Sequence, residues 1–226
     1  MRVHGFLLGF LAAGLLVSTA SAQLVISPIA VPPATKVEVG VATGCSAIDY
    51  SMYDGHSRTV YRGTLGASVA TSVDDTSDIW GSLNILGLSD ANTAQVDADL
   101  GYQLSIGGRW HVLQQGLGAV TLYGFGQYLF EKYSTAVGPR KMFLFEATGG
   151  VLGSYSFHPV LTGYLGAELV AYTDGEMSGV PDTDVERDGR VTVRGGAVYE
   201  LSKYFLRAEI ALGSERGILI GASRAF

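Results

Sequence analysis

Charged side chains share one register along several alternating segments of the chain, where they could pair with one another or line a conduit. Glu168 and Arg194 are examples, since the residues on either side of each are apolar or small. In a strand, alternate side chains point to opposite faces, so these charges would gather on one face of a sheet. The set on that face comprises Lys36, Glu38, Arg62, Asp97, Asp99, Glu146, Glu168, Arg190, Arg194, Arg207 and Glu209.

A second candidate for chemistry is the adjacent pair His56 and Ser57, which could act as a general base and a nucleophile. The pair follows Asp54 and Gly55 between two alternating segments, where a loop is expected. Adjacent residues in a loop rarely hold the geometry that such a pair needs. We therefore predict no catalytic residues and no enzymatic activity.

An acidic segment at residues 174–188 offers carboxylate oxygens, the ligands that calcium prefers. Asp182, Asp184, Glu186 and Asp188 alternate along it. Their spacing differs from that of a defined calcium-binding loop, and a solvated loop accounts for them as well. We predict no metal site and no cofactor.

The elements that would position these side chains are strands, because apolar and polar residues alternate with a period of two. Residues 92–105 show this best, since Ala94, Val96, Ala98, Leu100, Tyr102 and Leu104 all fall on one face. The pattern recurs at residues 35–43, 59–71, 78–88, 120–131, 141–155, 161–169, 190–200, 206–212 and 217–226. We predict an all-β chain of about ten strands, with eight as the alternative.

The length and polarity of these segments favour a closed antiparallel transmembrane β-barrel. Most are roughly nine to fifteen residues long, whereas a strand in a soluble protein has about five or six and a membrane-spanning strand about nine to eleven. Charges on the polar face are sparse and mixed with Gly, Ser and Thr, and the opposite face is apolar, as lipid requires. A closed sheet also satisfies the backbone without leaving an edge.

The regions outside the strands have distinct compositions. Residues 1–22 have the pattern of a signal peptide, with Arg2, an apolar stretch and the cleavage-site pattern Ala20-Ser21-Ala22. Residues 23–34 are punctuated by proline, which indicates an extended linker, so the barrel occupies residues 35–226. The 21 acidic residues exceed the 15 basic ones, which disfavours nucleic acid as a partner. Cys45 is the single cysteine and excludes an intramolecular disulfide.

The last strand, GILIGASRAF, ends on the aromatic Phe226 after an alternating run. Together with the leader and the series of alternating strands, it makes the chain resemble the small Gram-negative outer-membrane β-barrel proteins, the porin-like and OmpA–OmpX-type class. Arg224 departs from the C-terminal pattern of that class, and its head could reach outward to the interface. The resemblance implies an outer-membrane location, folding by the barrel-assembly machinery, and contact with outer-membrane lipid and lipopolysaccharide.

Counting strands back from the C-terminus assigns the connections to the two sides of the membrane. Residues 44–57, 131–140 and 173–189 become long external loops, and residues 107–118 become a periplasmic connection. Two aromatic rings then mark the interfaces. We predict Tyr102, Tyr155, Tyr199 and Phe226 for the periplasmic ring, and Tyr61, Phe143 and Phe145 for the external ring.

The resemblance and the charged face together predict a small porin-like or structural outer-membrane protein with a charged, largely filled lumen. Side chains fill most of a barrel of this size, so buried charges are expected to pair into a plug. The alternative for the lumen is a narrow conduit for cations or small polar solutes. The long loops leave open a role in binding or adhesion, and the remaining alternative is an enzyme acting at the external rim.

Overall fold

The computed structural model describes residues 37–52, 57–90, 97–98, 100–135, 138–178 and 183–226. Over these residues the chain forms strands joined by turns, and none of them belongs to a helix long and apolar enough to cross a membrane. The predicted signal peptide and linker, together with Lys36, lie outside the described residues.

The described residues form twelve strands, and each neighbouring pair in the sheet is antiparallel. They are β1 (Val37–Met52), β2 (Ser57–Ser72), β3 (Ser77–Asp90), β4 (Asp97–Ala98), β5 (Leu100–Gln115), β6 (Gly118–Thr135), β7 (Gly138–His158), β8 (Leu161–Met177), β9 (Thr183–Arg187), β10 (Val191–Leu201), β11 (Tyr204–Gly213) and β12 (Glu215–Ala225).

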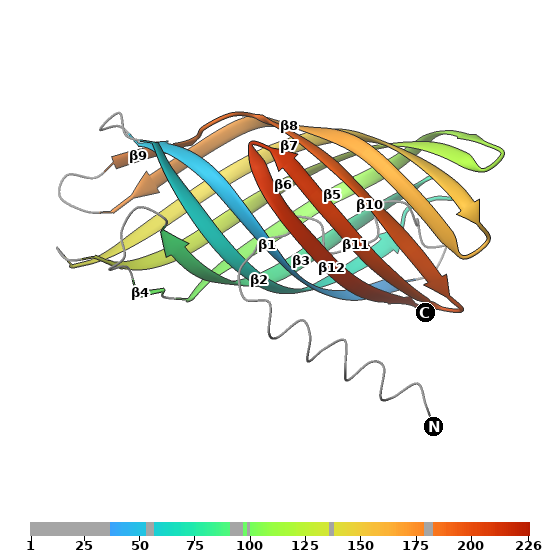
Figure 1. The fold of residues 1–226 in the computed structure, drawn as a ribbon, viewed down its shortest axis with the longest axis horizontal. Coiled ribbons are helices and arrows are strands. Elements are labelled where there is room, and N and C mark those ends of the chain that lie inside the picture. The colour runs from blue at the N-terminus through green and yellow to red at the C-terminus, as the bar shows by residue number, and fades with distance from the viewer. Residues whose placement is uncertain (1–36, 53–56, 91–96, 99, 136–137, 179–182) are drawn as a thin grey trace, which may run out of the picture.

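Ten of the strands close into a barrel in the order β1–β2–β3–β5–β6–β7–β8–β10–β11–β12, and β12 pairs with β1 again. Figure 1 shows these strands steeply tilted across the barrel. The predicted all-β, closed antiparallel barrel of ten strands is confirmed. We call the end at which β1 begins and β12 ends the terminal end, and the opposite end the loop end.

The strand β9 is inserted into the wall at the loop end. It pairs with the last residues of β8, where Glu176 faces Asp184, and with the last residues of β1, where Tyr50 faces Arg187. The shorter strands β10, β11 and β12 do not reach this level, because the turn between β11 and β12 at Ser214 lies below it. The wall is therefore completed by a strand from a segment predicted to be an external loop.

Several predicted loops are strand extensions. The predicted external loops at 44–57, 131–140 and 173–189 contribute to β1, β6, β7, β8 and β9. The predicted periplasmic connection at 107–118 is the lower half of β5, which continues to a tight turn at Gly116, where φ is 59°. Alternation of polarity fails there because Gly107 and Gly108 carry no side chain, and because a register shift between His111 and Leu113 leaves Val112 and Leu113 both exposed.

The inward side chains form three layers, as the strand β7 illustrates. Met142 and Leu144 belong to an aliphatic layer at the loop end, Glu146 follows in a polar band, and Leu152 belongs to an aromatic layer at the terminal end. The aliphatic layer contains Ile48, Tyr50, Val60, Leu86, Leu129, Met142, Leu144, Met177 and Val185. The aromatic layer contains Ala70, Trp80, Tyr123, Phe125, Leu152, Tyr164 and Val198, with Phe205 packed against it.

Candidate functional site

The centre of the polar band is the guanidinium of Arg194 on β10, which contacts one carboxylate from each of three strands. Its Nε donates to Glu168 Oε2 on β8 at 2.6 Å. Its Nη1 donates to Glu209 Oε1 on β11 at 3.1 Å, and its Nη2 donates to Glu215 Oε2 on β12 at 2.8 Å. One cation thus joins the four strands β8, β10, β11 and β12 through buried, charge-assisted hydrogen bonds.

Two tyrosines connect this centre to the aromatic layer. The hydroxyl of Tyr123 donates to Glu168 at 3.0 Å, and that of Tyr164 donates to Glu209 at 2.7 Å. Each tyrosine lies across a glycine of the neighbouring strand, Tyr123 across Gly150 and Tyr164 across Gly196. A Cβ at either glycine would come within 2.6 Å of the ring or its hydroxyl. Glycine is therefore required for the hydroxyls to reach the carboxylates.

The network continues toward the loop end through Glu215, which also faces Arg187 on β9 at 3.5 Å. Arg187 Nη1 in turn donates to Glu146 Oε2 on β7 at 3.2 Å. Glu146 also accepts a short hydrogen bond from Gln127 Nε2, and Gln127 Oε1 accepts one from Gln103 Nε2 at 2.6 Å. The chain of contacts runs from β5 across the lumen to β11. We call it the lumen ladder.

Two further buried pairs lie outside the lumen ladder. Arg62 donates through Nε to Glu131 Oε1 at 2.6 Å and through Nη2 to the Tyr50 hydroxyl at 2.5 Å, within the loop-end layer. Arg109 binds the Asp78 carboxylate toward the terminal end, with Nε at 2.9 and 3.1 Å from the two oxygens. Each charge removed from solvent in these pairs is offset by an opposite charge, as burial in a low-dielectric interior requires.

Seven of the eleven charged residues predicted for the inner face are buried in the barrel interior: Glu38, Arg62, Glu146, Glu168, Arg194, Arg207 and Glu209. Arg190 is a correction, because it is exposed in the bend before β10. Gly189 precedes it with φ at 84°, which turns the chain before the inward register begins at Thr192. Lys36 and Asp99 lie outside the described residues, and the side chain of Asp97 does so as well.

Within the part of the chain that the structure describes, five interior charges escaped the sequence prediction: Asp78, Arg109, Glu131, Arg187 and Glu215. Glu131 stood where the predicted strand 120–131 meets the predicted external loop 131–140, Arg187 fell in a predicted external loop, and Arg109 fell in the predicted periplasmic connection. The period of two does continue from Gln127 through Leu129 to Glu131, so extending that pattern would have found Glu131. No local pattern indicates that Arg187 enters the wall on a separate strand.

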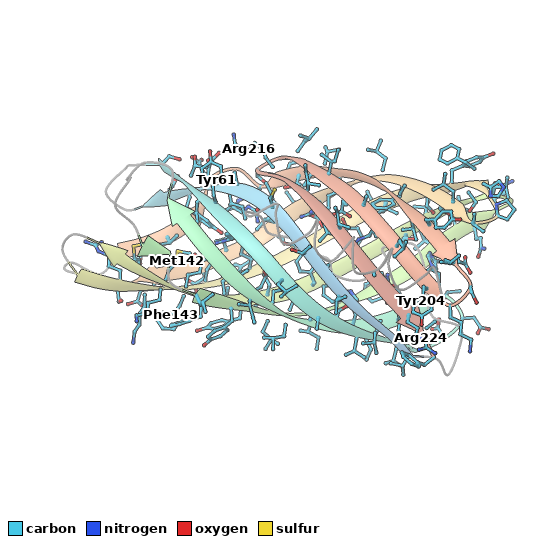
Figure 2. The ribbon with its side chains drawn as sticks, turned by 60° about the horizontal axis from the view of Figure 1, so that its bottom comes forward. Tyr61, Met142, Phe143, Tyr204, Arg216 and Arg224 are labelled. Atoms are coloured by element: carbon cyan, nitrogen blue, oxygen red, sulfur yellow. The ribbon has the colours of Figure 1, made fainter. Side chains whose placement is uncertain are left out.

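The outer face carries the aromatic residues predicted for the membrane interfaces. Tyr61, Phe143 and Phe145 are exposed toward the loop end, and Tyr155, Tyr199 and Phe226 toward the terminal end. Figure 2 shows Tyr61 and Phe143 near one end of the barrel and Tyr204 and Arg224 near the other. The Arg224 guanidinium lies over the rings of Tyr204 and Phe226, at 5.4 and 4.6 Å from their centroids.

Tyr102 is a correction to the predicted rings. It lies near the loop end of β5 rather than the terminal end, and its ring stacks on Phe130 with centroids 5.0 Å apart. The misplacement follows from the strand boundary, because β5 continues for thirteen residues beyond Tyr102 to Gln115. Tyr102 therefore belongs with Phe143 in the aromatic ring at the loop end.

The other candidate sites gain no support from the geometry. His56 lies outside the described residues, and the Ser57 hydroxyl donates to Asp188 at 2.9 Å. Among the described residues, no group of three or more His, Cys, Asp or Glu side chains is placed to hold a metal ion. The carboxylates of Asp184 and Glu186 point outward from β9, where both side chains are exposed.

Comparison with known proteins identifies the fold. No protein-family model and no curated protein matches the sequence. Among solved structures, the outer-membrane protease OmpT from Escherichia coli is similar with a TM-score of 0.54 at 8% identity, covering 88% of this chain and 100% of that one. An outer-membrane channel from Pseudomonas putida is similar with a TM-score of 0.50 at 13% identity, covering 89% and 100%. The chain therefore has the fold of the outer-membrane β-barrels.

Proposed function

We propose that this protein is a structural outer-membrane barrel whose lumen is closed by the lumen ladder, rather than an open porin. The observation that carries the proposal is the position of the ladder, which spans the interior between the aliphatic and the aromatic layer. A hydrated conduit would have to pass both apolar layers and the ion pairs between them.

The exterior supports a location in a membrane. Exposed apolar side chains cover the middle of the outer face, for example Leu65, Leu83, Leu104, Leu169 and Ile218. Aromatic groups lie toward both ends, as they do at the two interfaces of a membrane barrel. The terminal end then faces the periplasm and the loop end faces outward, after export through the signal peptide at residues 1–22 and assembly of the barrel.

The ladder opposes opening because its charged members are buried and paired with one another. Moving Arg194 aside would leave Glu168, Glu209 and part of Glu215 buried without their common cation. Breaking a buried pair in this way costs about 3–5 kcal/mol. Passage of small polar solutes would therefore need a rearrangement of several strands.

The test is conductance of the refolded protein in a planar bilayer. We expect the wild-type barrel to give no steps above background. The double variant Arg187→Ser, Glu146→Ser removes one cation and one anion of the ladder, and it is expected to give small steps if the barrel still folds. The control is Arg216→Gln, which changes an ion pair on the outer face. Steady wild-type channels that Glu168→Gln alters would overturn the proposal and place that residue in a conduit.

A further inference from the structure

The inner face of the polar band differs between two sides of the barrel. The lumen ladder occupies the strands from β5 to β12, where buried charged side chains meet one another. On β2 and β3 the inward side chains between the aliphatic and the aromatic layer are polar but uncharged. They are Thr64, Ser68, Ser82 and Asn84, and we call this set the neutral patch.

The members of the neutral patch are neighbours on two antiparallel strands. Ser68 on β2 lies directly opposite Ser82 on β3. Asn84 lies opposite Gly66, and a Cβ at Gly66 would overlap the Asn84 side-chain amide, so this amide lies over β2. On its other side Asn84 lies opposite Gln103, the first residue of the lumen ladder. The patch and the ladder therefore form one continuous polar layer inside the barrel.

The polar atoms of the neutral patch are buried without partners. The four residues are between 0% and 6% exposed. Among the described residues, no group forms a hydrogen bond with the hydroxyls of Thr64, Ser68 and Ser82 or with either amide atom of Asn84. Native proteins pair nearly all buried polar groups, because an unpaired one keeps the full cost of losing water. The patch therefore offers donors and acceptors to a ligand.

The wall beside the neutral patch carries very small inward residues. β1 contributes Gly40 and Ala42, β12 contributes Gly221, and β2 contributes Ala70, and all four are buried. Side chains just fill a barrel of eight strands, and a barrel of ten strands is wider. Residues this small therefore leave room in front of the patch for a ligand.

The chemistry of the patch selects an uncharged ligand. It consists of hydroxyl and amide groups only, and the charges of the neighbouring ladder, such as Arg194 and Glu168, already pair with each other. An ion placed here would lose its hydration without gaining a counter-charge, and an apolar molecule would leave the hydroxyls unpaired. A molecule with hydroxyl groups can donate and accept at the same time. Water meets this requirement when two to four polar groups surround it.

From these observations we propose that the neutral patch is a binding site for small uncharged molecules that carry hydroxyl groups. Two sources supply this chemistry, namely a cluster of long-lived water molecules and a small polyol such as glycerol. The inference goes beyond the proposed function, because it assigns a ligand to one side of a lumen that the ladder closes to passage.

The first test replaces polar groups of the patch by apolar groups of similar shape in the full mature protein, refolded in detergent. Thr64→Val and Asn84→Leu should each lower the thermal midpoint by about 2–4 °C, because each removes hydrogen bonds to the ligand. In a dry patch the same changes would remove an unpaired polar group and raise the midpoint. The matched control is Thr71→Val on the outer face of β2, which should leave the midpoint unchanged. Heat-modifiable migration in gel electrophoresis reports whether each variant is folded.

The second test detects water directly by nuclear magnetic resonance of the same protein in glycerol-free buffer. We expect cross-relaxation between water and the side-chain amide protons of Asn84, with the sign of a long-lived contact. Water in an open pore exchanges too fast to give that sign.

Two co-solvents distinguish the sources of the ligand. Glycerol and sucrose both stabilise proteins by exclusion from the surface, so the comparison is between wild type and Asn84→Leu in each. A larger rise of the wild-type midpoint in glycerol alone identifies a polyol site. Equal rises of wild type and variant in both solvents, together with the long-lived water contact, identify a water site. Both outcomes support the proposal.

Higher midpoints for Thr64→Val and Asn84→Leu than for the wild type would overturn the proposal. So would equal effects of the co-solvents without any long-lived water contact at Asn84. Failure of the proposed function is a separate result, because it would appear as wild-type conductance. A barrel that neither conducts nor holds water at the patch would leave the proposed function in place and overturn only this inference.

Discussion

The loop end and the middle of the barrel have opposite polarity although both are built from the same alternating strands. In the middle, charged residues such as Arg194 and Glu168 point inward, and apolar ones such as Val193 and Leu169 point outward. At the loop end, Leu144 and Val185 point inward, whereas Glu176 and Glu186 point outward. This exterior polarity fits the membrane location proposed above, with hydrocarbon around the middle and water beyond the aromatic rings.

Different forces hold the two interiors together. The loop end has the core of an ordinary soluble domain, in which apolar burial stabilises the fold. In the proposed membrane location, the middle gains nothing from turning apolar side chains inward, because lipid already removes outward ones from water. Its cohesion depends on buried ion pairs, where the loss of one partner matters more than the loss of contact area.

The largest loss of stability is expected on replacing Arg194, at the centre of the polar band. Arg194→Met should lower the free energy of unfolding by about 3–5 kcal/mol, because buried Glu168 and Glu209 lose this cation and Glu215 keeps only Arg187 nearby. The measurement is a denaturant titration of the barrel reconstituted in phosphatidylcholine vesicles, followed by tryptophan fluorescence. A loss below about 1 kcal/mol would show that water already enters the band and screens these charges.

Shortening a side chain of the aliphatic layer tests whether apolar burial stabilises the loop end. Leu144→Ala should lower the free energy of unfolding by about 2–5 kcal/mol, since it opens a cavity among packed aliphatic side chains. Outward Leu169→Ala in the middle is the matched control and should cost less in the same titration. Equal losses for the two leucines would contradict an apolar core at the loop end.

The two exteriors can be distinguished by adding a charge. Leu169→Arg places a cation on the outer face of the middle and should destabilise the reconstituted barrel by about 2–4 kcal/mol. Glu186→Arg makes a similar change on β9 at the loop end and should stay within about 0.5 kcal/mol. The measurement is the free energy of unfolding of both variants in vesicles. A larger loss for Glu186→Arg than for Leu169→Arg would contradict a lipid-facing middle and a water-facing loop end.

The smallest loss of stability is expected on breaking the ion pair between Arg216 and Asp49 on the outer face. Arg216 Nη2 lies 2.9 and 3.0 Å from the two Asp49 oxygens, but the side chains are 51% and 32% exposed. Solvent screening limits such a pair to about 0–1 kcal/mol. Arg216→Gln should therefore shift the unfolding midpoint far less than Arg194→Met, and a comparable shift would mean that the pair is desolvated by lipid.

The alternation of residues predicted the class of fold and much of the lumen. Because side chains in a strand alternate with a period of two, the inward placement of Arg62, Glu168 and Arg194 could be inferred locally. Strand length and an apolar outer register indicated ten long strands in lipid. The same alternation misplaced Tyr102, since in β5 it is interrupted at Gly107 and Gly108 and by the register shift after His111.

The outward-facing register follows from the amino-acid sequence alone, because it depends only on the preference of each side chain for lipid or water. Tertiary structure alone decided which charges meet. Arg187 reaches Glu146 and Glu215 only because β9 enters the wall between β8 and β1, and Arg194 gathers its three carboxylates only because the closed barrel sets the stagger between strands. Such pairings depend on residues far apart in the chain, and local alternation carries no information about them.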